Sequence, residues 1–266
     1  MGISLLLGVL VGIVLGLTGA GGGILAVPAL VAGMGWSMQQ AAPVALIAVA
    51  GGAALGAFEG WRKGLVRYKA ALVMVLTGIP LTSLGITAAH RLPQRWLLGL
   101  FAVVVLIVAA RLLSQSGANG GTRSDHLPVA VIDPKTGRFH WNLSTGVLFA
   151  SIGAATGFMT GLLGVGGGFI VVPALRRYTN VSVHGIVATS LLVIAMVGTG
   201  GILSAVAHGV QLPMPVTLLF ALATATGMTI GRKLAAHSPE ALVQRIFSLV
   251  LVMVAGGLIY KAMFIE

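Results

Sequence analysis

Two clusters of glycine hold the residues of this sequence whose spacing suggests chemistry. The segment GLTGAGGGILAVPAL, residues 16–30, reappears as GLLGVGGGFIVVPAL, residues 161–175, at a constant offset of 145. Glycines at a helix break expose backbone N–H groups with no side chain in the way. A helix that begins just after the break directs its positive N-terminal end toward it. Together these features predict two cradles for an anion that need no buried cation.

The candidate substrate-binding residues are these glycines and three hydroxyl groups. Thr18 lies within the first repeated segment, and Thr189 and Ser190 follow the second. Hydroxyls can donate to an oxyanion, although in membrane helices they often bond to their own helix or bridge to a neighbour. Pro28 and Pro173 are expected as structural helix-break residues, because each removes a backbone donor. The predicted substrate-binding set is Gly21, Gly22, Gly23, Gly166, Gly167, Gly168, Thr18, Thr189 and Ser190.

Other readings of the glycines are weaker or fail. The glycines can instead serve close helix packing alone, as small-xxx-small motifs do. A phosphate-binding P-loop needs Lys and then Ser or Thr after its last glycine, whereas Ile24 and Phe169 stand there. No paired carboxylates, Ser/His/Asp arrangement or metal-ligand spacing is recognisable in the apolar runs, so we expect no enzyme, no catalytic residue, no metal and no cofactor.

Composition decides the class of protein. Of the 266 residues, 57% are hydrophobic and 8% are charged, with only five acids and no cysteine, against about 45–50% apolar and about 25% charged in soluble domains. Such a chain cannot cover itself with a polar surface, so it is a multi-pass membrane protein. Its net charge of +11 comes from Lys and Arg spread between apolar runs, which marks membrane topology and does not indicate nucleic-acid binding.

The apolar runs predict two membrane repeats, 1–113 and 141–266, joined by a polar linker, 114–140. One helix over residues 2–34 would be about 50 Å long, more than the ~30 Å membrane core, so we expect a break at the glycines. The predicted fold is an all-α polytopic membrane protein of two inverted-topology repeats, each with a Gly-rich broken or re-entrant hairpin and three transmembrane helices. Expected helices are 2–18, 40–58, 65–89, 95–113, 141–163, 183–207, 213–235 and 242–263, with short pieces at 24–34 and 169–175.

The basic residues favour the inverted arrangement. If each glycine hairpin returns to its starting side, thirteen Lys and Arg gather on one side, and only Arg91, Arg95 and Lys261 remain on the other. Cytoplasmic loops carry such an excess. We therefore predict an inner-membrane protein with both termini outside and the linker in the cytoplasm. Glu59 is followed by Arg62 and Lys63, so we expect it to pair with basic residues at the interface; a proton relay is the alternative.

The duplicated motif G-L-x-G-x-G-G-G-x-x-x-V-P-A-L resembles the TauE/SafE family, also known as the TSUP or domain-of-unknown-function 81 group. The resemblance implies a plasma-membrane permease, and an exporter, for a small sulfur-containing anion such as sulfite or an organosulfonate. Residues 187–191, VATSL, are similar to a segment common after the second motif in that family. The first repeat departs from it with APVA at 42–45, which puts a symmetric site in doubt.

Inverted repeats with broken helices are typical of secondary transporters, which hold substrate near the membrane midplane. The expected partners are a small sulfur anion, the lipid bilayer and protons as a candidate coupling ion, with no nucleic acid; an oligomer stays open. An anion channel of the same fold and a non-transporting membrane subunit are the alternative functions. The absence of an ATP-binding motif predicts that an ion gradient or the substrate's own gradient drives transport.

Overall fold

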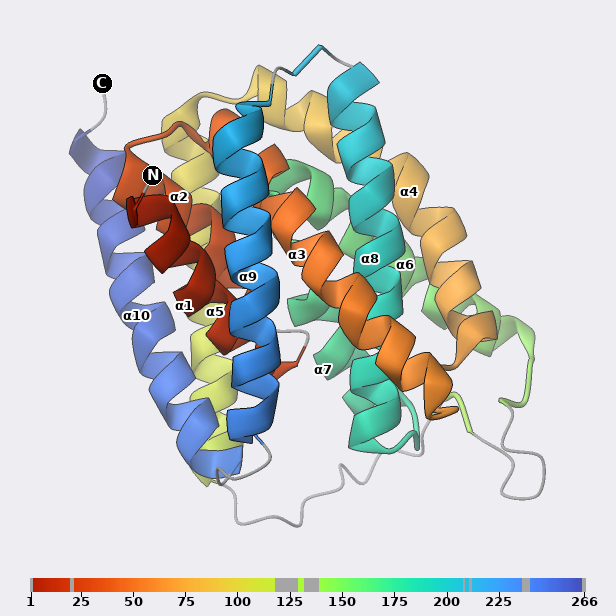
Figure 1. Ribbon diagram of the computed structural model, residues 1–266. Helices are drawn as coiled ribbons and strands as arrows, with labels where there is room; N and C mark the ends of the chain where they lie inside the picture. Colours follow the sequence, from red (N-terminus) through yellow and green to blue (C-terminus); the bar gives the residue numbers. More distant parts are fainter. Residues whose placement is uncertain are drawn as a thin grey trace.

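The computed structural model describes residues 2–19, 22–117, 129–131, 139–207, 209–210, 212–235 and 240–264. Within these ranges the backbone is almost entirely helical, and an isolated parallel bridge pairs Ala130 with Thr179. The elements are α1 (Gly2–Thr18), the 3-10 turn η1 (Gly22–Leu25), α2 (Ala26–Met34), α3 (Met38–Arg62), α4 (Tyr68–Arg91), α5 (Gln94–Gly117), α6 (Leu143–Leu163), α7 (Gly168–Tyr178), α8 (Val183–Ala207), α9 (Met214–Ala235) and α10 (Glu240–Phe264) (Figure 1).

Seven helices in the described ranges are long and apolar enough to cross a membrane: α3, α4, α5, α6, α8, α9 and α10. The helix α1 has 17 residues, and the segment Gly22–Met34 is a second short apolar piece. Large hydrophobic side chains cover the outside of the bundle, among them Leu106 on α5 and Leu249 and Met253 on α10, as a lipid-facing surface requires. The predicted all-α polytopic class is confirmed.

Local sequence signals set where several helices begin and end. The Ser37 side chain accepts from the Gln40 N–H and the Gln40 side chain accepts from the Ser37 N–H, which makes a capping box at the start of α3. Asn142 caps α6 by accepting from the Thr145 N–H at 2.7 Å. The helix α6 ends at Gly164, whose φ of 72° is left-handed, a conformation that glycine adopts without strain.

Glycine stripes allow two pairs of helices to pack backbone against backbone. In α1 the stripe Gly8, Gly12, Gly16 faces α9, and in α6 the stripe Gly153, Gly157, Gly161 faces α4. A Cβ on Gly12 would lie 2.8 Å from the Met228 N atom, and a Cβ on Gly157 would lie 2.6 Å from the Gly78 carbonyl carbon. Such spacing lets helices approach closely in lipid, where packing takes over much of the role of the hydrophobic effect.

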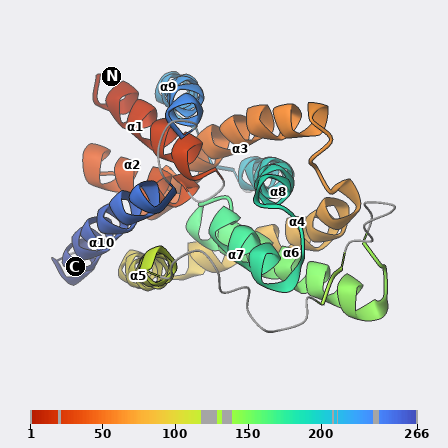
Figure 2. The ribbon, with the colours of Figure 1, turned by 90° about the horizontal axis from the view of Figure 1, so that it is seen from below.

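The helices α3 and α8 occupy the middle of the molecule and correspond in the two repeats. Adding 145 to both bounds of α3 gives the bounds of α8. They pack antiparallel, because Gly56 and Gly60 face Leu191 and Ala188, whereas Gly198 faces Ala50. Figure 2 shows α3 and α8 between the α1–α9 pair on one side and the α4–α6 pair on the other. The pairing of α1 with α9 thus has its counterpart in the pairing of α6 with α4.

The linker contacts the second repeat where the structure describes it. The Ala130 N–H donates to the Tyr178 carbonyl at 3.1 Å, at the end of α7, and the His140 N–H donates to the Val131 carbonyl at 3.0 Å. Residues 114–117 form the end of α5, and residues 118–128 and 132–138 lie outside the described ranges. Residues 129–131 therefore join the linker to the helix that follows the second glycine break.

Candidate functional site

A large cavity opens at one end of the bundle, between α1, α3 and α9 on one side and α7 and α8 on the other. Its volume is about 1190 Å³, which is above the range of ordinary ligand pockets. We call it the basic vestibule, because the charged residues that line it are one acid, Glu59, and five cations: Lys63, Arg111, Arg176, Arg232 and Lys233. We call the end of the bundle where it opens the basic end (the lower end in Figure 1).

The vestibule reaches the second glycine break. Gly164, Gly166 and Gly167 all have positive φ, between 67° and 75°, and Gly167 is the N-cap of α7. The first residues of α7, Gly168 and Phe169, line the vestibule. N–H groups in the first turn of a helix have no carbonyl upstream in the helix to bond. The positive end of the α7 dipole thus borders a cavity that is itself lined by cations.

The first glycine break is packed differently. Gly19 has a φ of 74° and lines the vestibule with Gly16 and Thr18. Gly22 and Gly23 form the start of η1 and are buried, and a Cβ on Gly22 would run into the backbone of α1. Neither residue lines a described cavity. Gly21 lies outside the described residues.

The two breaks approach each other beside the middle of α3 and α8. A Cβ on Gly23 would lie 2.9 Å from Val49 Cγ1 and 3.0 Å from the Val165 carbonyl oxygen. A Cβ on Gly166 would lie 3.0 Å from Val49 Cγ1 and 3.0 Å from Ile194 Cγ2. Val49 therefore lies against both breaks, and Ile194, which is 145 positions later, lies against the second. The structure thus brings Gly23 of the first break close to the backbone of Val165 at the second break.

The three candidate hydroxyls have different surroundings. Thr18 lines the vestibule, but its hydroxyl donates to the Val14 carbonyl at 2.8 Å. Ser190 is buried and donates to the Ile186 carbonyl at 2.8 Å. Thr189 is buried too, and its hydroxyl accepts from the Arg67 N–H at 3.0 Å, which ties the α3–α4 connection to α8. Their roles as substrate ligands remain predictions. The helix α7 continues through Pro173, and Pro28 lies in the first turn of α2.

Two threonines that the sequence did not single out lie against the second break. Thr156 and Thr160 on α6 are fully buried, and a Cβ on Gly167 would meet both side chains. The Thr160 hydroxyl donates to the Thr156 carbonyl at 2.7 Å. The Thr156 hydroxyl is buried without a hydrogen-bond partner among the described residues, which is costly for a polar group. From their helical spacing to Gly153 and Gly157, the sequence could have predicted that these threonines lie beside the packing stripe of α6. The contact with Gly167 could not be predicted, because it depends on the tertiary structure.

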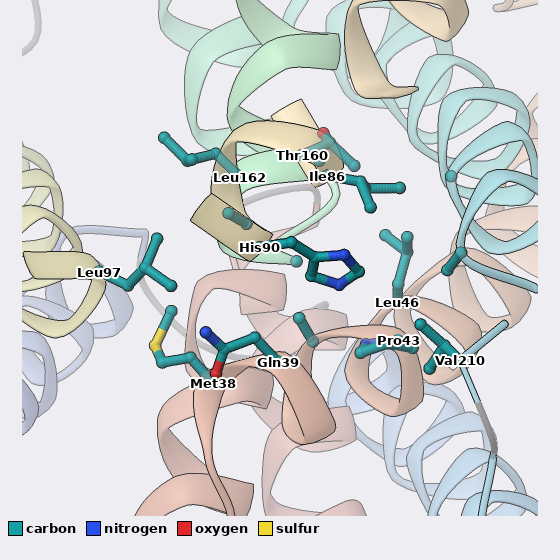
Figure 3. A pocket seen from close by; sticks show the side chains of 16 residues that line it. Met38, Gln39, Pro43, Leu46, Ile86, His90, Leu97, Thr160, Leu162 and Val210 are labelled. Carbon is teal, nitrogen blue, oxygen red and sulfur yellow. The ribbon is translucent and has the colours of Figure 1, made fainter. Parts of the chain in front are cut away.

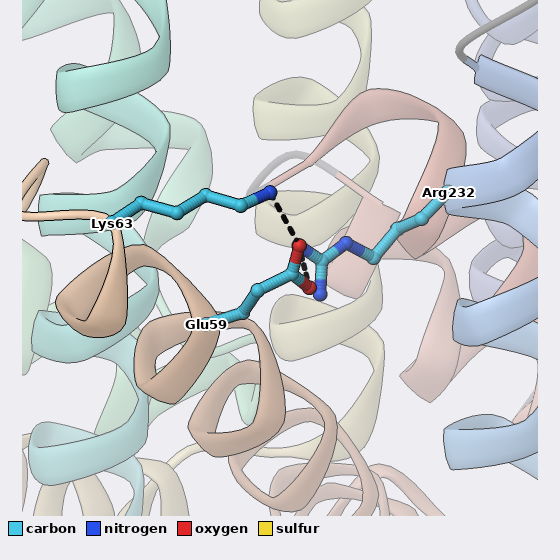
Figure 4. Close-up of polar contacts among 3 residues, drawn as sticks. All are labelled: Glu59, Lys63 and Arg232. Carbon is cyan, nitrogen blue, oxygen red and sulfur yellow. Dashed lines mark hydrogen bonds and ion pairs between the residues drawn. The ribbon is translucent and has the colours of Figure 1, made fainter.

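Glu59 holds two cations at the mouth of the vestibule (Figure 4). Its carboxylate pairs with Lys63 at 2.7 Å, one turn later on α3, and with Arg232 at 2.6 Å on α9. The expected pairing with a following basic residue is confirmed. The sequence did not predict the second ion pair, with Arg232, because that residue comes close only in the folded structure. The three side chains are between 32% and 61% exposed, so solvent screens the pairs and their contribution to stability is small.

We expect Glu59→Gln to change the free energy of unfolding by less than about 1 kcal/mol, because the ion pairs that it removes are partly exposed. The same variant adds one net positive charge to the vestibule. We therefore expect a lower KM for anion uptake from the basic end. Arg232→Gln is the matched control, since it breaks the same α3–α9 pair but removes a positive charge. A folded Glu59→Gln protein with no transport would instead indicate that the carboxylate carries an essential step, such as proton transfer.

A much smaller cavity lies on the other side of the second break. It is about 40 Å³ in volume and is lined by Gln39, Pro43 and Leu46 on α3, by His90 on α4, and by Thr160 and Gly164 (Figure 3). We call it the distal pocket. A volume of this size holds a few water molecules, at roughly 10–15 Å³ each. Gly164 borders the distal pocket whereas Gly168 borders the basic vestibule, so the break separates the two cavities.

The described residues contain no group of three or more His, Asp or Glu side chains close enough to hold a metal ion. The polar groups that the site presents are backbone N–H groups, hydroxyls and cations. This set suits an anion.

The family model of the sulfite exporter TauE/SafE matches residues 4–258, from the start of α1 to the last turns of α10. The chain belongs to this family. The match covers both glycine breaks and every helix that lines the vestibule. Together with the seven apolar helices, membership makes the chain a multi-pass membrane protein of a transporter family.

Several relatives that match this TauE/SafE chain over most of their length are named as probable membrane transporters. A protein of Xylella fastidiosa named "Probable membrane transporter protein" is 28% identical over 258 residues, which cover 96% of this chain and 93% of the relative. YunE of Bacillus subtilis, also named a probable membrane transporter protein, is 25% identical over 278 residues and 98% of each chain. The likewise named y4hK of Sinorhizobium fredii is 29% identical over 227 residues, 84% of this chain and 83% of the relative. No solved structure matches the chain significantly.

Proposed function

We propose that this TauE/SafE protein is a secondary transporter that exports a small sulfur-containing anion such as sulfite or an organosulfonate. The observation that carries the proposal is the basic vestibule, in which five cations and one acid surround a path that ends at the N-terminus of α7. Cations at the entrance raise the local concentration of an anion. Backbone N–H groups at the end of the path then offer hydrogen bonds without a buried counter-charge. The family's description supplies the sulfur chemistry.

The orientation that we propose places the basic end in the cytoplasm. Lys63, Arg111, Arg176, Arg232 and Lys233 all belong to the thirteen cations that the sequence assigns to the inner side. The linker then lies in the cytoplasm, both termini lie outside, and the two repeats have inverted topology. An inside-negative potential favours the exit of an anion by ~2.3 kcal/mol per charge per 100 mV. This energy suits export with or without a coupled proton.

Within the site, we propose that Gly166, Gly167 and Gly168 hold the anion when it enters from the basic end. Gly168 lines the cavity at the first turn of α7, and Gly166 and Gly167, both with positive φ, form the backbone that leads into it. The unpartnered Thr156 hydroxyl is a further donor next to Gly167. Gly21, Gly22, Gly23, Thr18, Thr189 and Ser190 complete the proposed set.

The test is uptake and counterflow in proteoliposomes with sulfite, sulfate, thiosulfate and sulfoacetate, and with a carboxylate as control, with and without a pH gradient. Saturable counterflow of one sulfur oxyanion supports the proposal, and its response to the pH gradient decides whether protons are coupled. Single-channel currents would identify an anion channel instead. No movement of any sulfur anion by folded protein would overturn the proposed function and favour the non-transporting subunit.

Neutralising one vestibule cation is expected to weaken uptake from the basic end without unfolding the protein. Arg111→Gln should raise the KM for sulfite about twofold to tenfold at low ionic strength, because it removes one of five cations from the entrance. In about 1 M salt the Debye length falls to about 3 Å, so the effect should nearly vanish. Arg245→Gln on α10 is the control, since Arg245 is exposed outside the vestibule lining. An equal, salt-independent effect of both variants would contradict electrostatic attraction.

A further inference from the structure

The distal pocket and the basic vestibule are built from corresponding residues of the two repeats. On α3, the distal pocket is lined by five residues between positions 38 and 46; on α8, the vestibule is lined by five residues between 183 and 191, each 145 positions later. The pair Leu46 and Leu191 is an example, and both side chains are about 3% exposed. Cavities that share no residue but share this pattern are related by the repeat.

The same correspondence holds for the rest of both linings. The distal pocket contacts Gly161, Leu162 and Gly164, whereas the vestibule contacts Gly16, Leu17 and Gly19. Gly201, Ala205 and Val210 stand in the distal pocket where Gly56, Gly60 and Leu65 stand in the vestibule. His90 likewise corresponds to Ala235. With the five positions on α3, twelve of the sixteen residues that line the distal pocket have a counterpart in the vestibule at an offset of 145.

We infer that the distal pocket is the closed outer vestibule of the transport path, and that the structure is the state open to the basic end. This inference rests on the proposed transport function. The two copies of the repeat differ in conformation within one molecule, because the vestibule has a volume of about 1190 Å³ and the distal pocket, its counterpart, has a volume of about 40 Å³. Exchanging the two conformations between the repeats closes the vestibule and opens the distal pocket. Inverted repeats in transporters alternate access in this way around a central site.

In this exchange, two groups of helices move relative to each other: α1, α3 and α9 form one group, and α4, α6 and α8 form the other. The Glu59–Arg232 ion pair ties α3 to α9, which packs on α1. A Ser204–Ser83 hydrogen bond of 3.1 Å ties α8 to α4, which packs on α6. Ser204 is the residue 145 positions after Glu59, whereas Ser83 lies one helical turn before Thr87, the counterpart of Arg232, so the two ties occupy similar places. Between the groups, α3 and α8 meet through glycine, alanine and leucine contacts at both ends, a smooth surface on which one helix can tilt against the other.

The inference assigns residues to an outer site that is now hidden. Gly168 and Phe169 border the vestibule at the start of α7, and their counterparts Gly23 and Ile24 are buried, with Ile24 only 1% exposed. In the outward-open state Gly23 and Ile24 line the outer vestibule and meet the anion. The outer lining is mostly apolar and holds no Lys or Arg: Gln39 stands where the vestibule has His184, and His90 is the one ionisable side chain among the lining residues. Electrostatic attraction of the anion is therefore confined to the basic end.

The chain has no cysteine, so single cysteines can report accessibility without background. Ile24→Cys and Phe169→Cys form the repeat-related pair, to be treated with a membrane-impermeant thiol reagent from either side of oriented proteoliposomes, with and without sulfite. We expect Phe169→Cys to react only from the basic end and Ile24→Cys only from the distal end. A condition that speeds one reaction should slow the other. Val105→Cys, fully buried on α5, is the control and should not react from either side.

Leu46→Cys and Leu191→Cys are the second pair, for use if the first does not fold. Sulfite counterflow is measured on the same vesicles. Counterflow with no reaction of Ile24→Cys and Leu46→Cys from the distal end would overturn the inference and leave the proposed function intact. Simultaneous, sulfite-independent reaction from both ends would overturn it in favour of an open pore. Reciprocal labelling without any sulfite movement would support the two-vestibule arrangement and refute sulfite as the substrate.

Discussion

Gly167→Leu is expected to abolish transport by protein that still reaches the membrane folded. Gly167 has a φ of 67°, and a Cβ at this position would collide with the side chain of Thr156 and lie 2.8 Å from the hydroxyl oxygen of Thr160. A residue other than glycine pays about 1–2 kcal/mol for the left-handed conformation alone. The N-terminus of α7 must shift to relieve both effects, and with it shift the N–H groups that we propose to hold the anion. Sulfite counterflow per folded transporter is the measurement.

Gly167→Ala separates loss of the site from loss of the fold. It adds the strain and the methyl group but no longer side chain, and we expect counterflow to fall at least about tenfold, since 1.4 kcal/mol corresponds to a factor of ten. The matched control is Gly51→Leu, on α3, where an added Cβ meets no atom within 4 Å. Near-normal counterflow of Gly167→Ala and Gly167→Leu would mean that backbone approach at the second break does not matter for transport.

The helices could be predicted closely because their signals are local. Apolar runs at 183–207 and 213–235 match α8 and α9 within one residue at every end. The piece after the second break was expected to end at 175, but α7 continues to Tyr178. Arg176 and Arg177 read as the end of an apolar run, yet both belong to α7, and Arg176 lines the basic vestibule. Hydropathy alone does not reveal that cavity.

The candidate site could be predicted only in part, because its geometry depends on contacts between distant segments. The repeated motif located both breaks, and the structure places Gly23 beside Val165, so that the two breaks meet there. The sequence could not show that the vestibule reaches α7 and leaves the start of α2 buried. Nor could it show that the Thr189 hydroxyl accepts from the Arg67 N–H, 122 positions away. A local motif identifies the chemical groups, and tertiary packing decides which of them face the cavity.

The packing interpretation of glycine is supported mainly at residues outside the two clusters. Gly12 and Gly157 belong to stripes that extend each repeated motif in the N-terminal direction, and they contact the backbones of α9 and α4. Spacing of four residues along a helix places such glycines on one face. Glycine thus has two separate uses in each repeat: one stripe assembles the bundle, and the cluster that follows it forms the break.

We therefore expect Gly157→Leu to prevent assembly of the bundle, in contrast to variants at the break. An added Cβ would overlap the backbone of Gly78, with the carbonyl carbon and Cα both 2.6 Å away. Backbone atoms in a helix cannot move aside as a flexible side chain can, so α4 and α6 must separate. Overpacking a core costs about 1–3 kcal/mol where side chains can adjust, and here we expect a loss of at least about 3 kcal/mol. Unfolding of purified protein in mixed detergent micelles measures it.

Gly146→Leu on the same helix is the control, since a Cβ there meets no atom within 4 Å, and it should change the free energy of unfolding by less than about 0.5 kcal/mol. Gly12→Leu in α1 should behave like Gly157→Leu, because a Cβ there collides with the Thr224 carbonyl in the repeat-related contact. Folded, stable Gly157→Leu protein would show that the α4–α6 distance can increase without loss of the bundle. That outcome would also remove the reason to treat these helices as one unit in the exchange between the two vestibules.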